Sequence, residues 1–180
     1  MSVAPPLIPA QLEWRGDVPV SAHYGDVYFS LEGGLTESRH VFLAANQLPQ
    51  RFSQADAFVI AELGFGTGLN MLAAWQLWQE LAPNNARLHF FSVEQHPLLP
   101  ADLARAHAAW PELAPFAARL QAIYPPSIPG FHTLMLDNRV TLTLCFGEAG
   151  AMLAEMQYPV DAWFLDGFSP ANNEQMWRTQ

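Results

Sequence analysis

The chain has 180 residues, which suits one domain, and 51% of them are hydrophobic, which excludes disorder as the main state. No apolar run reaches the ~18 residues of a membrane span, and the start lacks the basic and apolar regions of a secretory signal. A lone cysteine, Cys145, excludes an internal disulfide and a cysteine metal cluster, so we expect a cytoplasmic protein.

The charge is strongly acidic, with a formal net charge of -9, and all eight basic residues are arginines. An acidic domain should bind nucleic acid poorly by itself, because that affinity comes largely from neutralising phosphates. A nucleic-acid role would therefore need a local arginine patch or a basic surface elsewhere. The absence of lysine also excludes a Schiff-base lysine or a Walker-type lysine in this sequence.

The first 52 residues predict an extension rather than the main domain. Residues 1–16 are predicted to be a loose N-terminal segment, because the start is rich in proline. Residues 17–52 are predicted to form a β-hairpin followed by a helix. The hairpin strands are expected at 18–20 and 27–29. The helix is expected over 36–45, with Asn46 and Pro49 ending it.

Residues 53–180 predict an α/β domain in which strands alternate with helices. Strands are expected at 57–63, 88–93, 131–136, 140–146 and 160–165, the third and fourth forming a hairpin. Helices are expected at 69–81, 97–120 and 147–157, with a break at Pro111 or Pro115 in the second. This alternation favours a parallel sheet with helices on both faces, whose ligands bind beyond the carboxyl ends of the strands.

A glycine-rich loop, Gly64-Phe-Gly66-Thr-Gly68, follows the strand 57–63 directly. Glycines there allow a tight turn and a close approach of the backbone to a ligand. A dinucleotide fingerprint would need its third glycine at Leu69, so the loop fits a cofactor without a pyrophosphate better than NAD. An ordinary strand–helix turn is the alternative.

Three acidic residues also follow predicted strands. Glu94 has the right place to accept hydrogen bonds from both ribose hydroxyls, or is a surface residue at a strand end. Glu148 can contact an adenine edge, or simply favours a helix N-terminus. Asp166 can hold an amine in line with an electrophilic methyl group, or cap a helix.

The segment Glu62–Asn70 (ELGFGTGLN) resembles the first motif of the class I S-adenosylmethionine-dependent methyltransferases. Further segments resemble one family, the methyltransferase part of the bifunctional tRNA 5-methylaminomethyl-2-thiouridine biosynthesis proteins. They are 26–30, 34–43, 46–48, 51–52, 90–97, 161–173 and 176–177. This resemblance runs from about Asp17 to the end of the sequence.

The resemblance implies methylation of the exocyclic amine of 5-aminomethyl-2-thiouridine at the tRNA wobble position. S-adenosylmethionine would be the methyl donor, and FAD would serve only a second part of the longer relatives. By resemblance, Asp166 faces the reacting amine, Glu94 holds the ribose, Glu148 meets the adenine and Tyr28 closes the pocket. The cofactor loop would be shaped by Glu62, Gly64, Phe65, Gly66, Thr67, Gly68 and Asn70.

The family fold resembles a sheet of seven strands, and this sequence is expected to supply four parallel strands plus hairpin additions. We therefore expect a partial domain that lacks the last strands and the FAD part. Such a chain is expected to be weak or inactive alone and to associate through the exposed sheet edge. Its expected partner in the complete protein is tRNA, with neither membrane nor metal.

Three alternatives stay open at this point. A NAD-dependent oxidoreductase is disfavoured by Leu69 and would bind NADH. An N-methyltransferase of a small amine or polyamine would share every cofactor residue. A non-catalytic, truncated interaction module would bind no cofactor.

Overall fold

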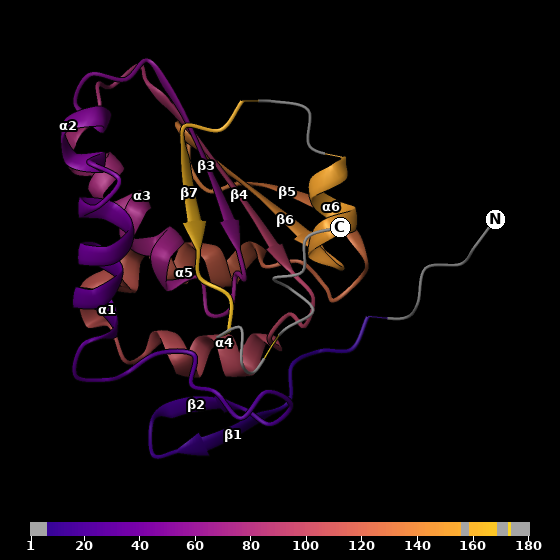
Figure 1. Ribbon diagram of the computed structural model, residues 1–180. Helices are drawn as coiled ribbons and strands as arrows, with labels where there is room; N and C mark the ends of the chain where they lie inside the picture. The colour runs from indigo at the N-terminus through magenta and orange to yellow at the C-terminus, as the bar shows by residue number, and fades with distance from the viewer. Residues whose placement is uncertain (1–6, 156–158, 169–172, 174–180) are drawn as a thin grey trace.

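A computed structural model describes residues 7–155, 159–168 and 173. Within them, one mixed sheet has the strand order β5-β6-β4-β3-β7 (Figure 1). Its strands are β3 (Ala57–Leu63), β4 (Arg87–Glu94), β5 (Gly130–Met135), β6 (Val140–Phe146) and β7 (Ala162–Leu165). β3, β4, β6 and β7 run parallel, while β5 pairs antiparallel with β6. The predicted parallel sheet with an added hairpin is confirmed.

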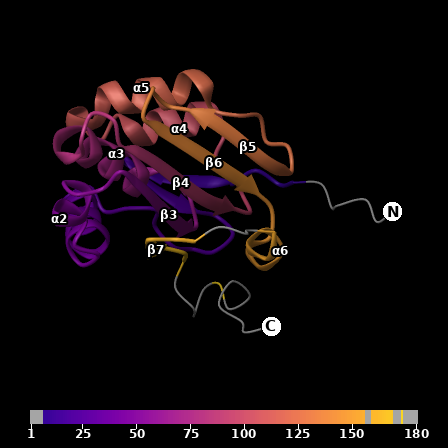
Figure 2. The same cartoon turned by 90° about the horizontal axis from the view of Figure 1, so that it is seen from above.

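Helices cover both faces of this sheet unequally. The described helical segments are α1 (Gly34–Glu37), the π-helix η1 (Ser38–Ala44), α2 (Leu48–Phe52), α3 (Leu69–Leu81), α4 (Pro100–His107), the 3-10 helix η2 (Pro111–Leu113), α5 (Ala114–Ile123) and α6 (Ala149–Ala154). Seen from above, α2 to α5 form a layer on one face, and α6 lies on the other (Figure 2). The bounds of β3 and α3 match those predicted.

Alternate strand residues explain this two-sided packing. Ile60, Phe90 and Phe164 are 0% exposed and belong to the large core beneath the helical layer. Their neighbours Ala61 and Phe91 face the other way and join a smaller cluster with α6. Because both faces of the central strands are covered, their sequences are apolar throughout rather than alternating.

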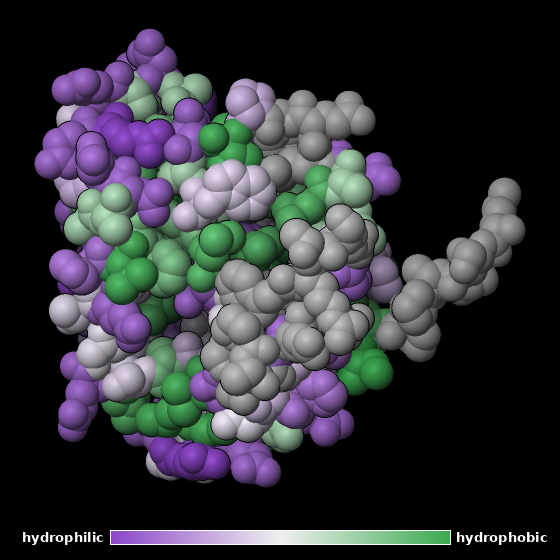
Figure 3. Space-filling model, in the orientation of Figure 1, coloured by the Kyte–Doolittle hydropathy of each residue, from purple (hydrophilic) through white to green (hydrophobic). Residues whose placement is uncertain are grey.

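The face that carries α6 retains exposed apolar side chains among the described residues. Trp163 and Leu165 of β7 are 41% and 56% exposed, and Phe131 and Met135 of β5 are 50% and 63% exposed. Figure 3 shows apolar surface between the helical layer and α6.

A clamp of backbone and side-chain bonds fixes the start of β7. The Asp161 backbone N–H donates to the Val59 carbonyl at 2.9 Å, and the Val59 N–H donates to Asp161 Oδ2 at 2.8 Å. Arg51 Nη2 donates to the Asp161 carbonyl at 2.8 Å. These hydrogen bonds attach α2 to the part of the sheet where β7 pairs with β3.

The hairpin prediction was wrong in its pairing. β1 (Leu12–Arg15) pairs antiparallel with β2 (Val18–Ser21), so a strand lies inside the segment 1–16 that was predicted to be loose. Gly16, with φ of +64°, makes the two-residue turn between them. The run 27–29 forms no strand and contributes only the bridge from Val27 to Val20.

The prolines end fewer helices than predicted. Pro49 was expected to end a helix, but it stands in the first turn of α2, where its missing N–H costs nothing. Pro111 begins η2, so the break in the helical region precedes it, while Pro115 lies in the first turn of α5. The helix expected over 36–45 begins at Gly34, and its larger part is the π-helix η1.

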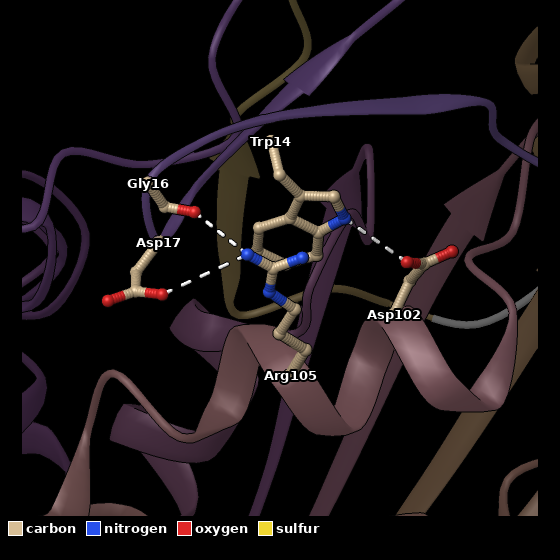
Figure 4. Close-up of polar contacts among 5 residues, drawn as sticks. All are labelled: Trp14, Gly16, Asp17, Asp102 and Arg105. Atoms are coloured by element: carbon tan, nitrogen blue, oxygen red, sulfur yellow. Dashed lines mark hydrogen bonds and ion pairs between the residues drawn. The ribbon is translucent and has the colours of Figure 1, made fainter.

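The β1–β2 hairpin is held against α4 by one arginine and one tryptophan (Figure 4). The Arg105 guanidinium lies 4.0 Å from the Trp14 ring centroid, and its Nη2 donates to the Gly16 carbonyl at 2.9 Å. Trp14 Nε1 donates to Asp102 at 3.3 Å, and Arg105 approaches Asp17 at 4.0 Å. The stacked ring and its hydrogen bonds should outweigh the exposed ion pair, because exposed pairs contribute little.

We therefore expect Trp14→Ala to lower the free energy of unfolding by about 1–2 kcal/mol, since it removes the cation–π contact and a hydrogen bond. Asp17→Asn is the matched control and should change it by less than about 0.5 kcal/mol. Urea denaturation of both variants measures the difference. Equal losses in the two variants would show that the ion pair, not the ring, holds the hairpin.

Candidate functional site

A cavity of about 770 Å³ lies at the carboxyl edge of the parallel strands. Nine of the eleven residues predicted for the site line it. They are Tyr28, Gly64, Phe65, Gly66, Thr67, Asn70, Glu94, Glu148 and Asp166. The other two, Glu62 and Gly68, lie behind this lining. The topology gathers these residues because β3, β4, β6 and β7 all end at this edge.

The glycine loop has a backbone that only glycine adopts readily. Gly66 has φ of +52°, and a Cβ there would lie 3.2 Å from the Tyr28 ring. Gly68 has φ of +74°, and a Cβ there would lie 2.6 Å from the Phe65 ring. The loop therefore turns sharply into α3 and brings bare backbone to the cavity wall.

Glu94 joins the end of β4 to this loop. Its Oε2 accepts the Gly66 N–H at 2.8 Å, and its Oε1 accepts the His96 N–H at 2.8 Å. Burial raises the pKa of this carboxyl, while the two backbone hydrogen bonds oppose the rise. Each oxygen keeps a further lone pair with which to accept a hydroxyl from a ligand in the cavity.

A second polar network lies behind the loop. Asn70 Nδ2 donates to Glu62 Oε1 at 3.1 Å and to Asp166 Oδ2 at 2.5 Å. Ser38 Oγ donates to Asn70 Oδ1 at 2.6 Å, and Ser92 Oγ donates to Glu62 Oε2 at 2.7 Å. Residues from η1, α3, β3 and β4 thus form one hydrogen-bonded network, which reaches the residue after β7 through Asn70.

The carboxyls of this network hold protons more tightly than usual. Glu62 is 1% exposed, and its burial raises its pKa well above the ordinary value, against the hydrogen bonds from Ser92 and Asn70. Asp166 opens onto the cavity, yet the surrounding protein removes enough water to raise its pKa to about 6. Asn70 opposes that rise, and the charge of Glu37 adds to it.

His107 of α4 supports the loop from outside the cavity, a role that no sequence motif indicated. Its Nε2 lies 2.8 Å from the Thr67 carbonyl and its Nδ1 lies 2.9 Å from Gln121 Nε2. Because a carbonyl only accepts, Nε2 carries the hydrogen, and a neutral ring then accepts the Gln121 amide at Nδ1. Burial lowers the pKa of His107, which favours this neutral ring.

Around the cavity, the predicted Tyr28 is joined by aromatic residues that were not predicted for the site. The Phe168 ring lies 4.9 Å from the Tyr24 ring and 5.1 Å from the Tyr28 ring, measured between centroids. His23 packs against Tyr24 at 4.5 Å and His96 at 5.8 Å. The sequence indicated this aromatic group only through the several ring-bearing residues between His23 and Tyr28. No spacing in the sequence links them to Phe168.

Glu148 has the capping role that was one of its two alternatives. Its carboxylate accepts the Gly150 and Ala151 N–H groups at 2.9 and 2.8 Å and so caps α6, while it also lines the cavity. Among residues 7–155, 159–168 and 173, no group of three or more His, Cys, Asp or Glu could hold a metal ion. No helix in the same ranges is long and apolar enough to cross a membrane.

Comparisons with known proteins show what the chain resembles. The family described as "S-adenosyl-L-methionine-dependent methyltransferase" matches residues 111–180. The tRNA 5-methylaminomethyl-2-thiouridine biosynthesis bifunctional protein MnmC of Methylobacillus flagellatus is 53% identical over 177 residues, covering 97% of this chain and 27% of that protein. The MnmC of Thiobacillus denitrificans is 51% identical over 175 residues, covering 97% and 28%.

A solved structure resembles almost the whole chain. The crystal structure of MNMC2 from Aquifex aeolicus superposes with a TM-score of 0.67 at 23% identity, covering 96% of this chain and 54% of that one. The chain has the Rossmann-like fold of the class I methyltransferases. The predicted resemblance to the methyltransferase part of the MnmC proteins is confirmed, and the chain spans about a quarter of their length.

The support from His107 yields a test that needs no ligand. His107→Phe removes the hydrogen bond to Thr67, so the loop should open more often and the Gly68 amide should exchange about tenfold faster. Hydrogen exchange followed by NMR measures this rate. His132→Phe is the matched control, because that histidine also bonds a carbonyl, Ile128, but far from the loop. An unchanged rate in His107→Phe would contradict the supporting role.

Proposed function

We propose that this chain binds S-adenosylmethionine and transfers its methyl group to the exocyclic amine of 5-aminomethyl-2-thiouridine at the tRNA wobble position. The observation that carries the proposal is one cavity that joins the glycine loop, Glu94 and Asp166. The relatives named for 5-methylaminomethyl-2-thiouridine biosynthesis supply the substrate. In the longer relatives, an FAD-dependent part would accompany this one, as the sequence resemblance implies.

The lining of the cavity suits this cofactor. A volume of about 770 Å³ lies within the range of small-molecule sites, roughly 300–1,000 Å³. The bare backbone at Gly66 would admit the methionine and ribose parts closely, and Glu94 would accept the ribose hydroxyls. Glu148 stands at the end of β6, where its cavity-facing side would meet the adenine. Leu69 in place of a third glycine argues against a pyrophosphate cofactor such as NAD.

Asp166 is the residue we propose for the chemistry. S-adenosylmethionine, when bound, supplies an electrophilic methyl group on a sulfonium. The Asp166 carboxylate would accept an N–H of the substrate amine and align its lone pair with that methyl carbon. The N–C bond forms as the C–S bond breaks, its electron pair stays on sulfur, and S-adenosylhomocysteine leaves. The proton lost by the amine goes to Asp166 or to water.

The aromatic residues around the cavity suit a flat base. The Tyr24 and Tyr28 rings both pack against Phe168, so the three form an aromatic group beside the cavity. An anticodon base can be splayed out of its loop and held against such rings.

The net charge of -9 instead favours a second candidate function, N-methylation of a small cationic amine, because acidic surfaces repel phosphates.

Titration calorimetry with S-adenosylmethionine tests the cofactor half, with NADH as the comparison ligand. We expect binding of S-adenosylmethionine alone, weakened at least tenfold in Glu94→Ala, which loses the ribose contact, and abolished in Gly66→Val. Glu13→Ala, an exposed change on β1, is the control and should bind as the unaltered chain does. Binding of NADH, or of neither ligand by a folded chain, would overturn the proposal.

Transfer of a labelled methyl group tests the substrate half. We expect label in 5-methylaminomethyl-2-thiouridine, at a low rate because the chain is expected to be weak alone, when tRNA carrying the aminomethyl base is the acceptor, and no label after Asp166→Ala. Mass spectrometry of the digested nucleosides identifies the product. Label in a polyamine but not in tRNA would instead support the small-amine candidate.

A further inference from the structure

We propose that Asn70 is a positioning residue for Asp166, and that the Ser38 hydroxyl anchors its amide. The inference deepens the proposed function and rests on it, because Asp166 is the group that would receive the substrate amine. It gives Asn70 a task other than contact with the cofactor. It also brings Ser38, in the N-terminal extension, into the site.

The hydrogen bonds leave Asn70 one satisfactory orientation. Its two amide hydrogens point at Glu62 Oε1 and Asp166 Oδ2, at 3.1 and 2.5 Å, while Oδ1 accepts the Ser38 hydroxyl at 2.6 Å. Turned over, the amide would set its oxygen against two carboxyl oxygens. The two carboxyl oxygens therefore select the orientation, and the Ser38 hydroxyl anchors it by donating to Oδ1.

Burial makes this chain of hydrogen bonds hard to replace. Ser38 is 2% exposed and Asn70 is 5% exposed, so water has little access to stand in for either partner. A missing donor would leave the buried carboxyl of Glu62 with an unmet hydrogen-bonding need, which is costly where water is excluded. The two carboxyls also repel each other when charged, and the Asn70 amide lies between them.

The consequence for Asp166 is a fixed carboxylate plane. Asn70 engages Oδ2, and no described residue forms a hydrogen bond with Oδ1. The side chain lines the cavity, so Oδ1 is the oxygen available to a substrate amine. Holding one oxygen of a carboxylate orients the other, and small errors of orientation at a reacting group cost large factors in rate.

Ser38 links this device to the N-terminal extension. It is the first residue of the π-helix η1, which packs beside α3, where Asn70 lies in the first turn. Figure 1 shows α1 and η1 running along the outside of α3. π-Helical turns are rare and often found at functional sites, and here the turn delivers a hydroxyl to a buried amide.

The groups that face Asp166 set the sign of the expected effect. They are Glu37 from α1, Glu62 from β3 and Asn70 from α3, of which only Asn70 donates a hydrogen bond. That bond stabilises the charged carboxylate. Without it the proton is held more tightly, so the pKa of Asp166 rises, and a larger fraction of the residue is protonated at any given pH.

The test is a titration of the Asp166 carboxyl by carbon-13 NMR in the 180-residue chain without substrate. Asp166→Asn identifies the resonance. We expect the pKa of Asp166, about 6 in the unaltered chain, to rise by at least half a pH unit in Asn70→Ala. Ser38→Ala, a milder substitution, should also raise it by at least half a pH unit. Ser92→Ala is the matched control, because that serine bonds Glu62 and not Asp166, and it should produce no upward shift.

The activity readout follows the same sign. In Asn70→Ala and Ser38→Ala, the acidic limb of methyl transfer should move to higher pH, with kcat reduced and the KM for S-adenosylmethionine unchanged. A raised KM for S-adenosylmethionine with an unchanged pH profile would overturn the inference. It would show instead that Asn70 acts by shaping the cofactor loop. An unchanged pKa of Asp166 in both variants would overturn the inference as well. Failure of the unaltered chain to methylate tRNA would count against the proposed function alone. Should Asn70→Ala fail to fold, Ser38→Ala decides.

Discussion

The site depends on a buried carboxyl, Glu62, that is held by neutral donors alone among the described residues. Ser92 supplies one hydrogen bond from β4 and Asn70 another from α3. A buried carboxyl without a cation must have such donors, because its desolvation is otherwise too costly. The same requirement draws three elements together at the carboxyl edge of the sheet. Asn70 also donates to Asp166, so Glu62 and the carboxylate that we propose for the chemistry share one supporting side chain.

The glycine loop adds the second constraint. Its backbone needs positive φ at three nearby positions, and its exposed carbonyls and N–H groups need partners. Glu94 supplies an acceptor from inside the cavity, and His107 supplies a donor from behind. The wall of the cavity is thus fastened on both sides before any ligand arrives, which is the preorganisation that a binding site requires.

The sequence predicted the parts of the fold that local patterns determine. Apolar runs buried on both faces gave β3 and the glycine break gave the start of α3, because these patterns have few other solutions. The acidic residues at the strand ends were found for the same reason. β1 was missed because polar residues surround its two-residue turn, so no apolar run marks the strand. Ser38 and His107 were missed because their partners, Asn70 and Thr67, lie 32 and 40 residues away in sequence.

The clamp at Asp161 bears on the site from the far end of β7. In the described part of the sheet β7 has four residues and pairs with β3 alone, so few ladder bonds resist sliding. A shift by one residue would turn Phe164 outward and carry Asp166 to the opposite face. Arg51 and Val59 hold Asp161 in place and so oppose that slip. Asp161 lies about 13–17 Å from Asp166, at roughly 3.3 Å per strand residue. The position of the Asp166 carboxylate is therefore set in part at a remote edge of the sheet, where a substitution would displace Asp166 without touching the cavity.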